Sequence, residues 1–144
     1  MENKPEILIS DTRRNYNLDE KFKILDTFEI ENQYAQLIRI QTKEFSAVCP
    51  GTGLPDIADI TIEYIPNKKC VELKSLKYYF FSFRNDAIFQ EPVTDIIFGH
   101  LLKCLEPKYL RIEVVYNIRG GFLTTTFAEF GNKNAHYPNL NIIS

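Results

Sequence analysis

The alternation of apolar and polar side chains predicts strands on both sides of a central helical region. Alternation with the period of two that is typical of strands occurs in residues 33–41, 56–65 and 109–117, and residues 122–130 form another β-rich segment. The turn-forming residues 66–69 come before residues 70–73, which favours a hairpin or a short strand pair. Residues 119–121, with two glycines, are expected to form the turn before the last strand.

Two helices are predicted between these groups of strands. Large apolar side chains recur at steps of three and four over residues 76–83, and Ser75 is a suitable N-cap for that segment. A second apolar stripe over residues 93–105 lies between Pro92, favoured in a first helical turn, and Pro107, which ends the helix. The order predicts an α+β fold, an antiparallel sheet with two helices on one face. Its open edges favour oligomers built edge to edge.

The chain length and the polar start of the chain suggest one domain with an extension. A length of 144 residues fits a single compact domain, so we expect residues 1–144 to form one. Residues 1–30 are mostly polar, and charged side chains interrupt any core pattern there. We therefore expect these residues to form an N-terminal arm with a loose start.

Composition and charge exclude several function classes. The 19 acidic and 17 basic residues give a net charge of −2, so no basic field attracts nucleic acid directly. No apolar stretch approaches the roughly 20 residues of a membrane span, and residues 1–10 lack a secretory pattern. We expect a cytoplasmic protein without membrane contact. Three cysteines without a close pair, and no HExxH or CxxC pattern, argue against disulfides and a metal site.

Cys49 and Asp56 are joined by a segment with four Pro or Gly residues, which holds a restricted geometry. One interpretation makes Cys49 a small apolar plug at a strand end. In the other, Cys49 is a nucleophile, and Asp56, with its pKa raised by apolar neighbours, takes the thiol proton and returns it. Neither histidine assists, because His100 lies at the edge of an apolar helical stripe and His136 in a polar tail.

Nucleotide binding by a Rossmann motif is not indicated. Gly51 and Gly53 are present, but Asp56 occupies the third glycine position. The lysines at 74 and 77 share one helix face, where they either bind phosphates or form a solvated surface. Glu91 either complements a helix dipole or accepts two N–H bonds from a purine-like edge.

The run ELKSLKYY at residues 72–79 resembles the signature of the QueF family. These are NADPH-dependent nitrile reductases that convert 7-cyano-7-deazaguanine to its aminomethyl product in queuosine biosynthesis. The order of CPGTGLPD, VELKSLKYY, FSFRN, QEP and IRGG resembles the short, single-module form over residues 45–121. The resemblance implies the tunnelling fold (T-fold), in which homo-oligomeric rings hold active sites at subunit interfaces.

The resemblance also implies roles for individual residues. Cys49 would attack the nitrile carbon to form a covalent thioimidate, and Asp56 would supply a proton to nitrogen. The residues expected to bind the 7-deazapurine are Val71, Glu72, Leu73, Gln90 and Glu91. Those expected to bind NADPH are Lys74, Ser75, Lys77 and Arg119. The family often has His where this chain has Gln90, an amide that hydrogen-bonds without changing charge.

Two other functions remain as alternatives. A cyclohydrolase-like or pterin-type T-fold enzyme would need a catalytic His or metal-binding Cys/His spacing, which the sequence does not offer. A non-catalytic purine-binding ring protein would keep Cys49 as a buried plug. Alkylation of the thiol, and protection by the cyano substrate, would distinguish the enzyme from the binding protein.

Overall fold

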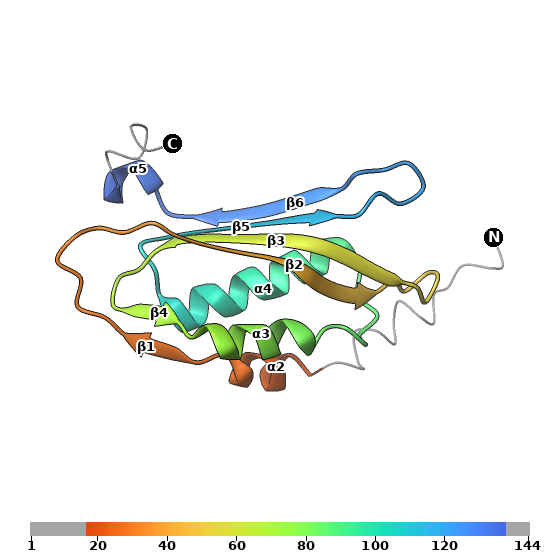
Figure 1. Cartoon of the computed structure of the whole chain (residues 1–144), viewed down its shortest axis with the longest axis horizontal. Helices are drawn as coiled ribbons and strands as arrows, with labels where there is room; N and C mark the ends of the chain where they lie inside the picture. Colours follow the sequence, from red (N-terminus) through yellow and green to blue (C-terminus); the bar gives the residue numbers. More distant parts are fainter. Residues whose placement is uncertain (1–16, 138–144) are drawn as a thin grey trace.

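The main sheet of the computed structural model, which describes residues 17–137, has four antiparallel strands in the order β2-β3-β5-β6 (Figure 1). Their bounds are Ile38–Val48 for β2, Pro55–Ile65 for β3, Tyr109–Tyr116 for β5 and Thr125–Phe130 for β6. The predicted alternation is visible in β5, where every second side chain is buried. The α+β class with an antiparallel sheet is therefore confirmed.

Strand β2 begins later than the alternation predicts and continues further. Residue 38 pairs with Tyr64, and β3 ends one residue later, before Pro66. No partner backbone remains for residues 33–37, so their alternation does not make a strand. Residues 45–48 instead pair with the start of β3, and the two strands close around the turn at residues 49–54.

Of the two alternatives predicted around residues 66–73, the hairpin is wrong, because β4 (Lys69–Val71) does not pair with β3 and belongs instead to a short strand pair. Its partner is β1 (Thr27–Glu29), and together they form a separate two-stranded antiparallel sheet. β1 follows helix α2 (Leu18–Ile24), in which Lys21 is buried and forms an ion pair with Asp86. The predicted arm over residues 1–30 is thus seen only from residue 17, and the remainder lies outside the described residues.

Helix α3 (Leu73–Phe81) begins before Ser75, which is therefore not its N-cap. The N-cap is Glu72, whose carboxylate accepts hydrogen bonds from the backbone N–H of Lys74 at 2.8 Å and of Ser75 at 2.9 Å. The carboxylate satisfies two N–H groups that have no partner inside the helix. The Ser75 hydroxyl instead accepts a hydrogen bond from the N–H of Asp26 at 2.9 Å.

Helix α4 (Gln90–Leu105) starts two residues before Pro92, which stays in the first turn, where a missing N–H has no intrahelical partner to lose. Both α3 and α4 lie on one face of the main sheet (Figure 1). The short helix α5 (Lys133–His136) follows β6. In residues 17–137 no helix has the length and apolar character needed to cross a membrane. Side chains from the sheet and both long helices form the core, including Phe45, Ile60, Ile62, Tyr79, Val93, Ile97, Leu101 and Ile112.

Candidate active site

Cys49 lies in the tight turn between β2 and β3. Its N–H donates to the carbonyl of Leu54 at 2.8 Å, and the N–H of Gly53 donates to the Cys49 carbonyl at 2.8 Å. Gly53 has a φ of 74°, a left-handed conformation that favours glycine. The turn is therefore closed by its own backbone, and the half-buried thiol is held in one place.

The same turn is tied to the segment that leads into α4. The N–H of Val48 donates to the carbonyl of Asp86 at 2.9 Å, and the N–H of Ile88 donates to the carbonyl of Val48 at 3.1 Å. Val48 directly precedes Cys49, and Ile88 comes three residues before Glu91. Cys49 and Glu91, the latter in the first turn of α4, therefore both follow closely in sequence after this hydrogen-bonded contact.

The surroundings of Cys49 favour its thiolate. Burial acts to raise the pKa of the thiol, and hydrogen bonds from the Thr52 hydroxyl and from the N–H groups of Gly51 and Thr52 outweigh it. The pKa of Cys49 therefore lies below its usual value. The sequence analysis missed Thr52, because threonine is common in such turns. Its hydroxyl also accepts a hydrogen bond from the Leu54 N–H at 3.2 Å.

Asp56 is the second residue of β3 and is 6% exposed. Burial raises the pKa of its carboxyl group, and Arg119 partly offsets this. Asp56 in turn acts to raise the pKa of Cys49, which places the two groups within electrostatic range of each other. A thiol with a lowered pKa near a carboxyl group with a raised pKa can share one proton between them.

Arg119 lies in the turn between β5 and β6, where its guanidinium is 3.4 Å from an oxygen of Asp56. The backbone of Arg119 and Phe122 exchanges two hydrogen bonds, at 3.0 Å and 2.9 Å. Gly120 and Gly121 have φ values of 56° and 83° in this turn. The structure therefore brings Arg119 to the carboxylate, away from the two lysines with which the sequence analysis grouped it.

The predicted site residues 71–75 form a second group at the other end of the molecule. Val71 ends β4, and its N–H donates to the hydroxyl of Tyr64 at 3.1 Å. Asp56 lies on the same strand as Tyr64, eight positions earlier, which corresponds to roughly 25 Å at the rise of a strand. Figure 1 shows β4 and the start of α3 at the left, and the β2–β3 turn at the right. Within one chain, residues 71–75 therefore do not meet Cys49.

Gln90 and Glu91 belong to the Cys49 end, since they form the first turn of α4. Glu91 is exposed and Gln90 is half-buried. Glu72, in contrast, is occupied by its own helix as the N-cap of α3. The carboxylate of Glu91 is thus the better placed of the two to bind a ligand near Cys49.

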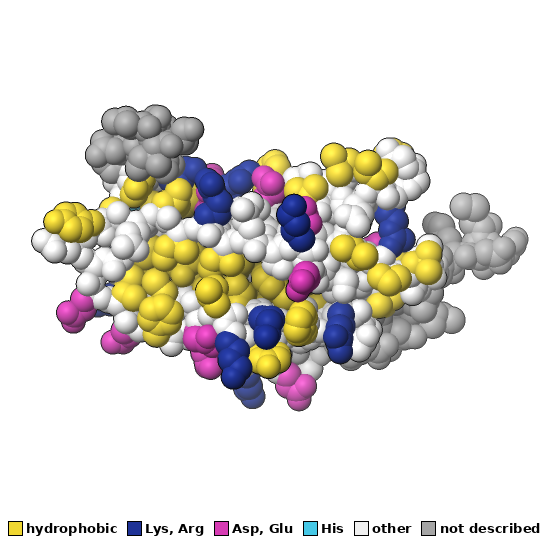
Figure 2. Space-filling model, in the orientation of Figure 1, with side chains coloured by type: hydrophobic (Ala, Val, Ile, Leu, Met, Phe, Trp, Pro, Cys, Tyr) yellow, Lys and Arg dark blue, Asp and Glu magenta, His cyan; other side chains and the backbone are white. Residues whose placement is uncertain are grey.

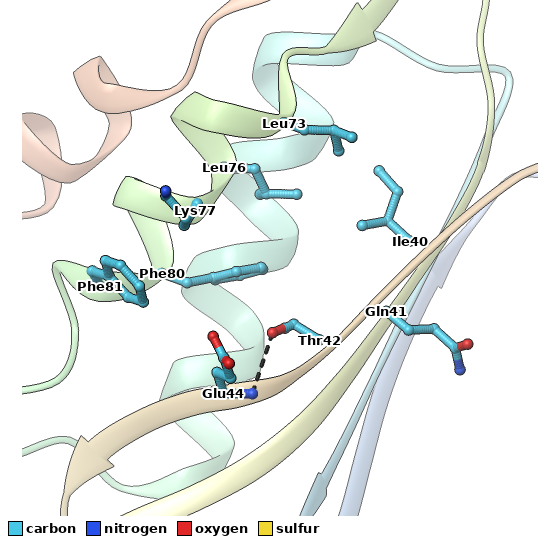
Figure 3. Close-up of a pocket in the computed structure, with 9 residues that line it drawn as sticks. All are labelled: Ile40, Gln41, Thr42, Glu44, Leu73, Leu76, Lys77, Phe80 and Phe81. Carbon is cyan, nitrogen blue, oxygen red and sulfur yellow. Dashed lines mark hydrogen bonds between the residues drawn. The ribbon is translucent and has the colours of Figure 1, made fainter.

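A groove of about 250 Å³ lies between α3 and β2 (Figure 3). Two predicted site residues, Leu73 and Lys77, line it, and neither Cys49 nor Asp56 does. Apolar side chains form most of its wall, and Figure 2 shows a broad hydrophobic area over this region. The apolar side chains in its wall are Ile40, Leu73, Leu76, Phe80 and Phe81.

Comparison with known proteins identifies the family. A family model described as QueF-like protein matches residues 55–135, more than half of the chain. The chain belongs to the QueF family. The family resemblance drawn from the motifs is thereby confirmed, and the match includes Asp56 and Arg119 but begins after Cys49.

Two curated relatives illustrate the similarity to the QueF family. An NADPH-dependent 7-cyano-7-deazaguanine reductase of Chloroherpeton thalassium is 50% identical over 113 residues, which cover 76% of this chain and 96% of that protein. A protein of the same name from Thermotoga maritima is 54% identical over 100 residues, covering 69% of this chain and 71% of that protein.

A solved structure shares the fold. The crystal structure of the archaeosine synthase QueF-Like in the apo form matches with a TM-score of 0.62 and 24% identity, covering 67% of this chain and 94% of that one. At this identity the likeness supports the fold alone.

Proposed function

We propose that this QueF family protein reduces the nitrile of 7-cyano-7-deazaguanine to the aminomethyl group, using two equivalents of NADPH, in queuosine biosynthesis. The observation that carries the proposal is the pairing of Cys49 with Asp56 in a chain whose relatives bear that reductase name. The plug interpretation of Cys49 is disfavoured, because the thiol is half-buried and its pKa is lowered.

The proposed first step forms a covalent thioimidate. The Cys49 sulfur adds to the nitrile carbon, and one π pair of the triple bond moves to nitrogen. That nitrogen takes the proton that Asp56 has received from the thiol, so no proton is gained or lost by the site. A nitrile is a poor hydride acceptor, whereas the trigonal C=N of the thioimidate can be protonated and reduced.

In the following steps four electrons reach the substrate as two hydrides, while residues of the site bind the intermediates and transfer protons. Two NADPH molecules, bound in turn, would each supply one hydride, the first to the thioimidate carbon and the second to the imine that remains after the sulfur leaves. Asp56 holds and releases protons at the nitrogen, and Arg119 keeps its carboxylate in place. The proposed site must also exclude water, because water would hydrolyse the imine to an aldehyde.

Two of the four residues expected to bind NADPH, Lys74 and Lys77, match its phosphates in charge. Lys74 and Lys77 are exposed and lie three residues apart on α3, so both ammonium groups can reach one side of the helix. Ser75 is buried, and its hydroxyl donates to the carbonyl of Glu72 at 2.7 Å, which leaves it a structural role at the helix start.

We further propose the T-fold assembly, in which a ring of copies forms each active site between two subunits. The separation of residues 71–75 from Cys49 supports it, because a site with both groups needs a second copy. Exposed apolar side chains also gather around the Cys49 end, over both turns (Figure 2). These side chains are Leu54, Ile57, Ile118, Phe122 and Leu123.

The deciding experiment measures NADPH oxidation by the purified protein with 7-cyano-7-deazaguanine. We expect two NADPH to be consumed for each amine formed, and a thioimidate absorbance when the substrate is added without cofactor. Cys49→Ala should remove that absorbance. No oxidation, or an unchanged adduct in Cys49→Ala, would contradict the proposal. A cyclohydrolase-like enzyme would instead release a ring-opened product without consuming NADPH.

A further inference from the structure

Tyr116 carries a buried hydroxyl group without a hydrogen-bond partner among the residues that the structure describes. Tyr116 is 2% exposed. The other fully buried tyrosines are all bonded. Tyr64 accepts from the Val71 N–H at 3.1 Å, Tyr79 bonds His100 at 2.7 Å, and Tyr109 donates to Glu129 at 2.7 Å. Buried polar groups are bonded in the large majority of cases, so this exception calls for a functional explanation.

The position of Tyr116 places its hydroxyl at the Cys49 end of the molecule. Tyr116 ends β5 and pairs with Ala58 on β3. Asp56 lies two residues before Ala58, so its side chain is on the same buried face of the sheet. Because Ala58 is small, the space between the tyrosine and the carboxylate is not filled by the side chain opposite Tyr116.

Two carboxylates act on this hydroxyl from different elements. Burial raises the pKa of Tyr116 most, and Asp56 on β3 and Glu91 on α4 raise it further. Tyr116 therefore stays protonated and is a hydrogen-bond donor at neutral pH. Its hydroxyl lies within electrostatic range of both the proposed proton carrier and the proposed purine-binding carboxylate.

The chemistry of the substrate matches this arrangement, an inference that rests on the proposed function. In 7-cyano-7-deazaguanine the 6-oxo group lies between the ring N1–H, which Glu91 would bind, and the cyano group, which Cys49 would attack. A donor on which both Asp56 and Glu91 act is therefore suited to bind that oxygen. We propose that the Tyr116 hydroxyl donates a hydrogen bond to the 6-oxo group of the bound 7-deazapurine.

This bond would give the site selectivity for an oxo group. A buried hydroxyl without a partner in residues 17–137 gains one when the ligand binds, so it discriminates against ligands that cannot accept well. The 6-thio analogue keeps the ring N1–H and the exocyclic amine, so contacts with Glu91 persist, while the sulfur is a weaker acceptor. Comparing the 6-oxo and 6-thio compounds therefore isolates the contribution of the Tyr116 hydroxyl to binding.

The test compares the 6-oxo and 6-thio compounds with Tyr116→Phe. Binding is measured by calorimetry in a Cys49→Ala background, so that no covalent adduct forms. We expect the preference for the oxo compound to fall by about tenfold in Tyr116→Phe. An unchanged preference would overturn the proposal. If the wild-type protein oxidises no NADPH, the reductase function fails, but the binding ratio still decides whether Tyr116 reads the oxo group.

Tyr109→Phe provides the matched control, since it is the same change at the other end of β5. The Tyr109 hydroxyl is already bonded to Glu129, so its loss should lower the melting temperature by about 3 °C while leaving the oxo preference unchanged. Tyr116→Phe should not lower the melting temperature of the ligand-free protein. If Tyr116→Phe lowers the melting temperature as much as Tyr109→Phe and leaves the preference for the oxo compound unchanged, the Tyr116 hydroxyl has a structural role and the proposal is wrong.

Discussion

Two regions of the molecule contain the same kinds of side chain but treat them in opposite ways. The end of the molecule around Cys49 (the site end) holds this thiol, the Tyr116 hydroxyl and the Asp56 carboxyl group, while a cluster between α3 and the C-terminal half of α4 holds Cys104, Tyr79 and His100. Burial raises the pKa of Cys104 to about 11. Burial also lowers the pKa of His100, with a further contribution from Lys103, so the imidazole stays neutral. At the site end the pKa of the thiol is lowered instead.

The hydrogen bonds of the two regions differ in the same sense. In the cluster between α3 and α4 the Tyr79 hydroxyl bonds the Nδ1 of His100 at 2.7 Å, and the Cys104 thiol donates to the Leu101 carbonyl at 3.7 Å. At the site end the Tyr116 hydroxyl has no partner in residues 17–137. Polar groups that bond one another stabilise the fold, whereas groups left unpaired or shifted in pKa are available to a ligand.

Replacing each thiol by Ala should give the largest difference between the regions. We expect Cys49→Ala to lower turnover of the cyano substrate by at least about a thousandfold, because the covalent route is lost. Cys104→Ala should keep wild-type turnover within about twofold and cost about 1 kcal/mol of stability from lost packing. Steady-state rates and thermal melts of both variants make the comparison. Comparable turnover losses would mean that the thiols are not distinguished by their surroundings.

Asp56→Asn should lower kcat by about a hundredfold or more, since an amide cannot carry the proton. The stability of the Asp56→Asn variant at neutral pH should instead equal or exceed that of the wild type. Because the folded-state pKa of Asp56 is raised, its contribution to stability is present at low pH and is lost as the pH rises through that pKa. The half-exposed Arg119 pair offsets little of this. A melting temperature clearly below wild type at neutral pH would show that the carboxylate stabilises the fold.

Alkylation by iodoacetamide should separate the two thiols by rate. Cys49 is expected to react at least about tenfold faster than Cys104 at neutral pH, because its thiolate fraction is larger. Raising the pH should accelerate Cys104 across the whole alkaline range and Cys49 only until its thiol is ionised. Peptide mass spectrometry at a series of pH values reads both sites in one sample. Parallel pH profiles would contradict the pKa difference.

The sequence predicted the sheet and both long helices because their apolar periods persist over many residues. It did not predict α2 and β1, which are short and polar and depend on contacts with distant residues. Lys21 of α2 is buried against residues far along the chain, where Asp86 pairs with it and Ser82 accepts its hydrogen bonds. β1 forms only because β4 pairs with it. Neither contact produces a periodic pattern of apolar residues in the sequence.

The site was predictable where the chain itself is stiff. Cys49 and Asp56 stand out because Pro and Gly residues hold the loop between them. Thr52 and Tyr116 did not, since a threonine in a turn and a tyrosine at a buried strand position are both ordinary. Their importance lies in hydrogen bonds that are made or missing in three dimensions.

Tyr79→Phe should give the smallest effect and the sharpest contrast with Tyr116→Phe. Removing the Tyr79 hydroxyl leaves the Nδ1 of His100 without its partner, which costs about 1 kcal/mol because the half-buried ring can regain a water. The melting temperature should fall by about 3 °C, and turnover should not change. Tyr116→Phe loses no bond within residues 17–137 and should show the reverse, a changed substrate preference with unchanged stability. If both variants lose stability equally, the hydroxyl groups of the two regions are equivalent, and the distinction between a bonded packing cluster and an open binding site fails.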